Sequence, residues 1–455
     1  MNERRVIESA AHPLPAQNIA VIGSGISGLA AAWLLSQHHQ VSLFEAAPRA
    51  GGHSNTVEVA SAGAGGAALP VDTGFIVYND HAYPNLAALF AHLGVATRPT
   101  EMSFAVSLDG GALEYSGSDI GGLFAQRGNI VSLRFWSMLR DLLRFYREAP
   151  RDAERLGPVS LDQYLDARGY GRAFREDHLY PMAAAIWSTP AAKIGRYPVA
   201  AFVRFCENHH LLKLSGRPAW RSVVGGSREY VRRMTHTLGA GVRLGERVSG
   251  ILREPGGVRV AGASGLLPQR FDQVVIATHA DQALRLLDPP SDAEKRLLGA
   301  FSYSRNLALL HTDRALMPQR RQVWSSWNYL AQRGTADKLC VSYWMNRLHG
   351  VESPQPLFVT LNPLCEPRAG SVLHEEMYEH PLFDLNALRA QSQLWSLQGR
   401  QRTWYCGAYF GAGFHEDGLQ AGLAVAEAIG GVRRPWTVAG ESGRIVLPTL
   451  RVRAS

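Results

Sequence analysis

Near the start of the chain, blocks of apolar residues alternate with small and polar ones in a pattern that predicts two strands around a helix. An apolar run at residues 19–22 is followed by a glycine-rich turn, Gly23 to Gly28, and by an apolar stretch at residues 29–35 with helical character. A second apolar run, residues 41–44, ends at Glu45. This order of strand, tight turn, helix and acid-ended strand is typical of the opening βαβ unit of a dinucleotide-binding fold.

Three glycines of the turn have separate tasks in such a unit. Gly23 permits the sharp turn, Gly25 lets the backbone approach a pyrophosphate, and Gly28 lets the helix pack closely on the strand. The free N–H groups and the dipole at the helix start favour an anion there. Glu45 is then placed to accept hydrogen bonds from ribose hydroxyls.

Helical spacing of apolar residues recurs later, at residues 82–94, 132–149, 161–168, 173–187, 228–238 and 419–429. In the second of these segments, Leu133, Trp136, Leu139, Leu143 and Tyr146 share one face, and arginines lie on the others. This pattern predicts a helix packed over a substrate domain. The alternative is a basic amphipathic helix that docks on a membrane surface.

Short apolar runs typical of strands form two groups. The first lies at residues 57–59, 68–71, 242–244, 248–253, 258–261 and 271–278, with a flexible hairpin tip at 61–66. The second lies at 306–312, 323–329, 339–345 and 357–362, with a turn at 333–337, and predicts an antiparallel sheet. We therefore expect a cofactor domain at 17–80, 221–288 and 400–432, a substrate domain at 81–220 and 289–399, and terminal extensions at 1–16 and 433–455.

Composition and charge agree with a soluble two-domain protein. The chain has 455 residues, of which 46% are hydrophobic and 19% charged. The net charge of +8 suits an anionic cofactor, and an anionic substrate or phospholipid surface, although a solvated basic surface explains it equally. We find no dense basic tract or nucleic-acid-binding motif, so nucleic acid is not an expected partner.

The cysteines and the N-terminal segment bear on localisation. Cys206, Cys340, Cys365 and Cys406 are scattered without a C-x-x-C pair, which predicts reduced, buried thiols and no metal site. Residues 1–18 lack the apolar segment of a secretory signal, and no apolar run reaches about 18 residues. We expect a cytoplasmic protein, with peripheral contact at the inner membrane face as a further option.

Three further segments favour FAD over NAD as the cofactor. Arg49 to His53 follows the ribose carboxylate, and its paired glycines let the chain pass close to a diphosphate that Arg49 could neutralise. The second segment is Val71 to Phe75. The third, Trp404 to Gly418, predicts a strand, a glycine-rich loop and a second helix start. Two distant helix starts suit FAD, whose diphosphate and isoalloxazine need separate cradles.

Together these motifs resemble the flavin-containing amine oxidase and phytoene-desaturase superfamily. The resemblance is carried by Gly23–Gly28, Glu45, Arg49–Gly52, Asp72–Gly74, Gly225-Gly226, Val274–His279 and Gly413–Gly418. It implies an α/β fold, with an FAD-binding Rossmann-like domain of the glutathione-reductase and amine-oxidase type and an interleaved α+β substrate domain of sheet and helices. Residues 51–56, 73–79 and 413–418 are most similar to a bacterial group of predicted NAD/FAD-binding oxidoreductases that occur beside, or fused to, cyclopropane-fatty-acid synthases.

The resemblance extends to individual residues and implies noncovalent FAD, since no cysteine matches a covalent attachment site. The expected cofactor-binding residues are Gly23, Gly25, Ile26, Ser27, Gly28, Glu45, Ala46, Arg49, Gly51, Gly52, His53, Thr73, Gly74, Phe75, Val248, Thr278, Gly407, Gly413, Phe414, His415 and Gly418. The strand before the late loop often ends Gly-Asp in the superfamily, but here it ends Gly407-Ala408. The missing carboxylate contact could come from Glu416 or Asp417, which could equally be helix caps.

Catalytic and substrate-binding candidates follow from their positions near these loops. His53 and His415 are the histidines nearest to the flavin loops and are candidate proton acceptors, with a structural role as the alternative. Trp327, Tyr329, Tyr343 and Trp344 lie on predicted substrate-domain strands and are candidate pocket walls, although such aromatics are equally normal in a core. None of the four lysines, Lys193, Lys213, Lys295 and Lys338, matches the lysine that many amine oxidases place near the flavin.

Three functions remain open at this point. The first is an FAD-dependent oxidoreductase that takes hydride from an apolar substrate, such as a modified fatty acyl chain on a phospholipid. The second is an amine oxidase that produces imine and hydrogen peroxide. The third is a noncatalytic FAD-binding partner of a cyclopropane-fatty-acid-synthase-like methyltransferase.

Overall fold

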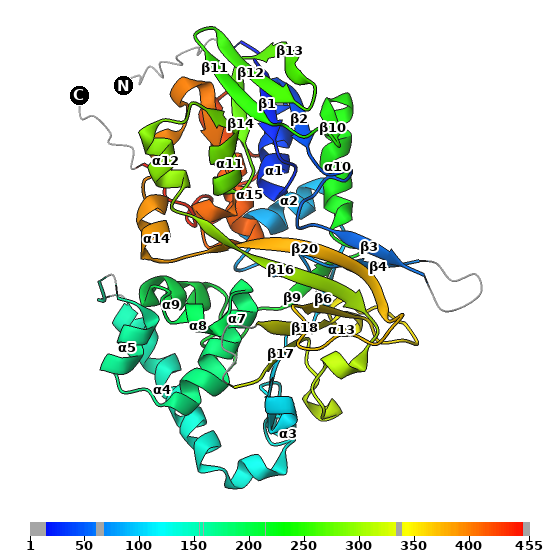
Figure 1. The fold of residues 1–455 in the computed structure, drawn as a ribbon, viewed down its shortest axis with the longest axis vertical. Helices are drawn as coiled ribbons and strands as arrows, with labels where there is room; N and C mark the ends of the chain where they lie inside the picture. Colours follow the sequence, from blue (N-terminus) through cyan, green and yellow to red (C-terminus); the bar gives the residue numbers. More distant parts are fainter. Residues whose placement is uncertain are drawn as a thin grey trace, which may run out of the picture.

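The structure is a computed structural model that describes residues 15–60, 68–153, 155–157, 159–213, 215–333 and 339–448. Figure 1 shows an upper half built around a parallel sheet and a lower half of strands and helices, with the long strands β16 and β20 crossing between them. The predicted hairpin tip at 61–66, Lys338 and most of the predicted turn at 333–337 lie outside the described residues.

A parallel sheet of five strands forms the centre of the upper half. Its order is β10 (Val242–Leu244), β2 (Gln40–Glu45), β1 (Asn18–Ile22), β14 (Gln273–Ile276) and β21 (Thr403–Tyr405). Ile19, Ala20 and Val21 are fully buried, as expected for an apolar strand covered on both faces. The predicted βαβ opening is thus confirmed, and three distant parts of the chain share this sheet.

Helices cover this centre, and three smaller sheets lie against it, beside it or below the long strands (Figure 1). The helices are α1 (Ile26–Leu35), α2 (Pro84–Leu93), α10 (Arg228–Leu238), α11 (Ala280–Leu286), α12 (Asp292–Leu298), α14 (Leu385–Gln391) and α15 (His415–Ile429). One smaller sheet has four strands, in the order β13 (Gly265–Phe271), β12 (Gly257–Gly262), β11 (Gly250–Glu254) and β15 (Leu287–Asp288). The second is the hairpin of β3 (Thr56–Val59) and β4 (Leu69–Asp72). The third has the order β5 (Tyr78–Asn79), β9 (Trp220–Val223) and β6 (Thr97–Thr100). Gly422 lets α15 approach α1, since a Cβ there would lie 2.1 Å from the Ser27 carbonyl oxygen.

A seven-stranded sheet spans the lower half. Its order is β20 (Val372–Leu382), β16 (Ser302–His311), β19 (Phe358–Leu361), β18 (Cys340–Trp344), β17 (Trp327–Ala331), β7 (Phe104–Leu108) and β8 (Leu113–Ser116). Only the β17–β7 pair is parallel. The four strands predicted from 306 to 362 are present, whereas β7, β8 and β20 were not predicted.

One group of helices lies at one end of this sheet: α3 (Ile120–Leu123), α4 (Leu133–Ala153), α5 (Leu161–Ala167), α6 (Arg172–Phe174), α7 (Tyr180–Trp187), α8 (Ala191–Ile194) and α9 (Val199–Asn208). α13 (Met345–His349) lies apart from them, beside β6, β9 and β18. The single helical stretch predicted at 173–187 is divided in the structure. One wide π turn, Arg175–Leu179, precedes α7 and accommodates Pro181, which has no N–H to donate.

Two expectations about the chain need adjustment. Residues 433–448, expected to be part of a terminal extension, pack on the upper half, where Arg434 is buried and pairs with Glu427 at 2.8 Å. Cys365 is exposed, so the prediction of buried cysteines is wrong for this one. Within the described ranges, no helix combines the length and apolar character needed to cross a membrane.

Candidate active site

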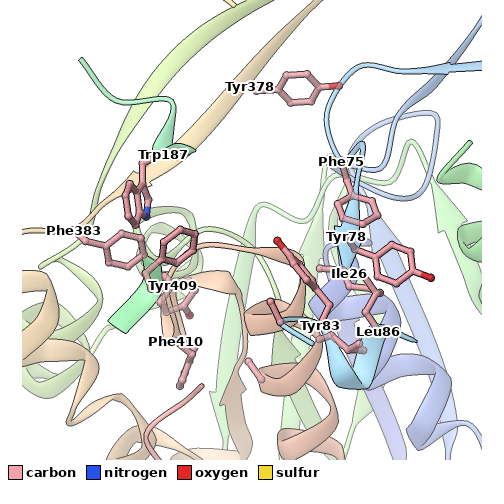
Figure 2. Packing of buried hydrophobic residues seen from close by; sticks show 14 of the residues in the cluster. Ile26, Phe75, Tyr78, Tyr83, Leu86, Trp187, Tyr378, Phe383, Tyr409 and Phe410 are labelled. Atoms are coloured by element: carbon pink, nitrogen blue, oxygen red, sulfur yellow. The ribbon is translucent and has the colours of Figure 1, made fainter. Parts of the chain in front are cut away.

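A large cavity of about 1900 Å³ lies between loops of the parallel sheet and the helices of the lower half. This volume exceeds the roughly 300–1,000 Å³ typical of a pocket for one small ligand. In Figure 2, Phe75 and Tyr83 on one side face Trp187 and Phe383 on the other across an open space, and all four line the cavity. The size leaves room for a large cofactor and a second molecule.

The glycine-rich turn forms one end of the cavity. A Cβ on Gly23 would lie 2.9 Å from the Ala277 carbonyl oxygen, and one on Gly28 would lie 1.9 Å from the Gly23 carbonyl oxygen. A Cβ on Gly25 would instead meet no atom within 4 Å. Gly25 is also the N-cap of α1 and supplies no capping side chain, so the helix start is open to an anion from the cavity.

Glu45 ends β2 at the cavity wall beside this turn. Its carboxylate accepts hydrogen bonds from Ser24 N at 2.9 Å, Ser24 Oγ at 2.6 Å and Ala47 N at 2.8 Å. These bonds fix the carboxylate at the edge where a ribose is expected, while a carboxylate keeps further acceptor capacity. Val248, another expected cofactor contact, also lines the cavity.

Loop 49–53 approaches the turn by its backbone. Gly52 has a φ of +56°, and a Cβ there would lie 3.1 Å from Gly25 Cα. Arg49 corrects an expectation, because its guanidinium donates to the Gly52 carbonyl oxygen at 2.8 Å and pairs with Glu376 at 3.4 Å. Arg49 does not line the cavity, so it holds the loop together rather than facing a diphosphate.

The late loop forms another part of the wall. Gly413, which has a φ of +94°, and Phe414 line the cavity at the start of α15. Gly418 does not line it, because a Cβ there would lie 2.9 Å from Ile26 Cγ2. The prediction of a cofactor contact at Gly418 is therefore corrected to close packing between α15 and α1.

Glu416 and Asp417 are cap residues and do not replace the missing carboxylate contact. Glu416 accepts from the backbone N–H of Asn85 at 3.1 Å and of Leu86 at 3.0 Å, at the start of α2. Asp417 accepts from Phe414 N at 2.8 Å and pairs with Arg444 at 2.7 Å. Neither acid lines the cavity.

His415 is held from several directions. Its ring stacks on Phe75 with centroids 3.8 Å apart, and its Nε2 lies 2.9 Å from Ser54 Oγ, which also contacts the Tyr230 hydroxyl. Burial lowers the pKa of His415 to about 3. A neutral ring with such fixed contacts favours a positioning role over proton acceptance.

His53 lies in a cluster of rings on the cavity wall. Ring centroids are 5.0 Å from Tyr378, 5.3 Å from His380 and 6.4 Å from His279. Burial, reinforced by His380 and His279, lowers the pKa of His53 well below its ordinary value. His279 Nδ1 in turn lies 3.3 Å from a Glu379 carboxylate oxygen. Burial also lowers the pKa of His279, so the rings of this cluster favour the neutral form.

Three members of this cluster come from β20, which the sequence analysis did not predict. Tyr378, Glu379 and His380 all line the cavity. The strand alternates exposed and partly buried residues and is rich in charge, so it lacks the apolar run by which strands were recognised. Finding this strand from the sequence would require a test for a two-residue period over 372–380, in place of the search for an apolar run.

The four predicted aromatic residues divide into two pairs. Trp327 and Tyr343 line the cavity and pack edge to face at 5.2 Å. Tyr329 is buried away from the cavity, and Trp344 packs against Trp324 at 5.6 Å beside a separate small pocket. The expectation of a pocket position is therefore corrected for both: Tyr329 shares the face of Trp327 but lies beyond the cavity, and Trp344 faces the other way.

Taken together, most of the residues predicted to bind the cofactor line this cavity. Those that line it are Gly23, Gly25, Ile26, Ser27, Glu45, Ala46, Gly51, Gly52, His53, Thr73, Gly74, Phe75, Val248, Thr278, Gly407, Gly413, Phe414 and His415. Trp187 Nε1, Trp327 Nε1 and the Tyr409 hydroxyl also lie at the cavity without a partner among the described residues. Space beside Gly25, an open helix start and unpaired donors together fit an elongated, anionic, aromatic cofactor such as FAD.

Metal chemistry has no comparable support. Among the described residues, no group of three or more His, Cys, Asp or Glu side chains could hold a metal ion. The three rings around His53 have centroids 5.0–6.4 Å from its own.

Comparison with known proteins identifies the family. AofH of Mycobacterium tuberculosis, which is named as a flavin-containing monoamine oxidase, is 29% identical over 307 residues, covering 65% of this chain and 64% of its own length. Putrescine oxidase bound to putrescine has a TM-score of 0.62 at 17% identity, over 91% of this chain and 99% of that one. A fatty acid isomerase from P. acnes has a TM-score of 0.64 at 14% identity, over 91% and 98%. These two structures share the fold.

The family match covers most of the chain and agrees with the cavity geometry. Flavin containing amine oxidoreductases match residues 26–355, which begin at the first helix start and reach into the substrate half. The match makes FAD the cofactor of the glycine-lined end of the cavity. The chain therefore belongs to the flavin containing amine oxidoreductase family and is an FAD-dependent oxidoreductase.

Proposed function

We propose that this oxidoreductase removes hydrogen from a fatty acyl chain, free or attached to a phospholipid and carrying a methyl branch or cyclopropane. FAD, when bound, accepts a hydride from a C–H bond held against its ring. The protein must then orient the chain, exclude water and receive a proton.

The observation that carries the proposal is the lining of the cavity beyond the cofactor end. Its apolar members include Met102, Phe104, Leu123, Leu139, Leu142, Leu143, Met182, Ile186 and Leu211. This part of the cavity reaches α3 and α4, where Arg140 and Arg217 also line it. An apolar part of the cavity that also carries cationic side chains suits an acyl chain with an anionic head.

Residues between the two ends have roles that follow from their contacts. Trp327 and Tyr343 form an aromatic wall that orients an apolar chain. His53 lines the cavity and can accept a proton at a ring nitrogen, as a weak base whose pKa burial lowers. The wall positions the substrate, and His53 receives the proton that accompanies hydride loss.

The test is anaerobic mixing of the purified holoenzyme with phospholipids that carry straight, methyl-branched or cyclopropane chains. Loss of flavin absorbance together with product lipids lighter by two hydrogens is the expected result. A Leu142→Arg variant, which puts a charge into the apolar part of the cavity, should lose turnover while keeping its flavin. Absence of both bleaching and new unsaturation with every lipid would refute the proposal.

Amine oxidation is the second candidate, because the curated relative AofH is named as a monoamine oxidase. Against it, Lys193, Lys213 and Lys295 do not line the cavity. Two of the lining carboxylates are also engaged, Glu101 with Arg347 at 2.6 Å and Asp119 with Gly122 N at 2.6 Å. A peroxide assay with polyamines and arylamines distinguishes this activity. A third outcome would favour the noncatalytic role: the protein binds FAD and co-purifies with a cyclopropane-fatty-acid-synthase-like methyltransferase, but it oxidises neither lipids nor amines.

A further inference from the structure

Six large apolar side chains at one end of the molecule face solvent. We call them the entrance patch: Ile120, Ile130, Val131, Leu133, Trp136 and Leu143. Leu133 is 87% exposed and Val131 83%, whereas the most exposed large apolar side chain described outside the patch, Val446, reaches 46%. In Figure 1 the cyan segment that includes α3 and α4 lies at the lower end of the molecule, far from both termini. A clustered apolar surface of this kind marks an interaction site.

The entrance patch is continuous with the cavity. Ile120, Trp136 and Leu143 both face solvent and line the cavity. Leu139 and Leu142 carry the apolar lining inward from the same helix, α4. A molecule that covers the patch therefore also covers an apolar way into the active site.

Three arginines accompany this apolar surface: Arg127 and Arg140 lie on the segments that carry it, and Arg217 lines the same cavity. Arg127 and Arg217 are exposed and form no ion pair with any described residue. Arg140 is 73% exposed and contacts only its neighbour Asp141, at 3.3 Å. The acid that lines the cavity here, Asp119, caps α3 through Gly122 N. The surroundings of the patch are thus positive, and they complement an anionic surface.

We propose that the entrance patch docks on an anionic phospholipid bilayer, with the cavity entrance turned toward the acyl chains. Exposed Leu, Val and Trp side chains enter the boundary between headgroups and acyl chains, and the arginines meet the phosphates. A second copy of this chain fits less well, because a two-fold contact through this surface would bring like charges together. The route by which substrate enters rests on the proposed function, but docking itself does not.

The test is co-flotation of the full-length holoenzyme with vesicles of phosphatidylcholine, with and without phosphatidylglycerol. We expect binding that requires phosphatidylglycerol and weakens with added salt. A Val131→Ser/Leu133→Ser double variant should bind at least about tenfold more weakly, since it removes two of the most exposed apolar groups. Neither residue lines the cavity, so flavin content and turnover of detergent-dispersed lipid should not change. The matched control is Leu244→Ser/Leu266→Ser, which changes two other exposed leucines and should bind as the unaltered protein does.

The outcomes separate docking from catalysis. Failure of the unaltered protein to float with phosphatidylglycerol vesicles, or equal binding by the double variant, would overturn docking. Self-association that the double variant abolishes, measured by light scattering, would make the patch an interface between copies and also overturn it. Vesicle binding without turnover of any lipid would leave docking supported and refute only the proposed function.

Discussion

Replacing Gly25 with alanine tests whether the open space at the first helix start belongs to the cofactor. The φ and ψ of Gly25 are −64° and 175°, which any residue can adopt, and the new methyl group would meet no protein atom within 4 Å. The flavin-free variant should therefore lose only about 1 kcal/mol, the usual cost of a poorer helix N-cap. The methyl group would instead stand where the backbone is expected to approach a diphosphate.

The expected effect on FAD is much larger than the effect on folding. Loss of one charge-assisted hydrogen bond to a phosphate costs about 1.5–3 kcal/mol, or about 10–150-fold in Kd. At a free FAD concentration of about 100 times the original Kd, the cofactor adds about 2.7 kcal/mol of stability. If the variant binds about a hundredfold more weakly, that contribution falls to about 0.4 kcal/mol. Flavin fluorescence titration gives the Kd, and thermal unfolding with and without FAD gives the stability.

Gly28→Ala is the matched control, with the opposite signature. Its methyl group would lie 1.9 Å from the Gly23 carbonyl oxygen, so the flavin-free form should itself be destabilised, by about 1–3 kcal/mol or more. The reasoning is refuted if Gly25→Ala binds FAD as tightly as the original protein. It is also refuted if the two flavin-free variants unfold with equal ease.

Three further changes test other parts of the site. Asp417→Asn leaves the buried charge of Arg444 without its partner and should cost about 3–5 kcal/mol in chemical denaturation, without changing FAD affinity, because Asp417 does not face the cavity. Burial lowers the pKa of His380 to about 4, so between about 6.5 and 4 only the unfolded chain protonates this ring. The free energy of unfolding should therefore fall as the pH drops through that window. In thermal melts across this pH range, the His380→Gln variant should show a smaller fall, because it lacks the titrating ring. Trp327→Ala should change KM for the substrate, because Trp327 lines the cavity. Trp344→Ala should lower only the unfolding temperature, because Trp344 packs on Trp324 away from the cavity. Steady-state kinetics and thermal melts on both variants measure the two effects.

The cofactor end of the site could be predicted from short sequence patterns because local geometry dictates the residue types there. Gly23 adopts a positive φ of +101° and Gly28 has no room for a Cβ, so a side chain is excluded at both positions. Gly25, in contrast, is open on the cavity side. The positive φ of Gly23 and the contact between Gly28 and Gly23 act within six residues, so a short sequence pattern records them, although Ala277 also crowds both glycines.

Charged residues near the cofactor were harder to assign, because their partners are distant in the sequence. Arg49 pairs with Glu376, on a strand more than 300 residues away. Glu416 caps a helix that begins at Pro84, and Asp417 neutralises Arg444. Each side chain lies near the cofactor loops in sequence, but the most favourable partner comes from tertiary packing.

The substrate end depends even more on strand pairing. Trp327 and Tyr329 are two residues apart and share one face of β17, yet only Trp327 reaches the cavity. Trp344 turns to the opposite side, where it packs with Trp324. Periodicity indicates which residues share a face, but it does not indicate which face a neighbouring helix will cover.

Loop 49–56 connects the cofactor end to the wall of the substrate cavity. At one end, Gly52 lies against Gly25 at the first helix start. At the other, the Asn55 side-chain amide donates to Tyr378 Oη and to Glu376 Oε2 on β20, each at 3.1 Å. Because β20 also contributes to the ring cluster around His53, the residues expected to hold the diphosphate and those expected to receive the proton share one short segment. A change that displaces this loop should therefore alter cofactor affinity and substrate geometry together, so the two halves of the chain form a single functional unit.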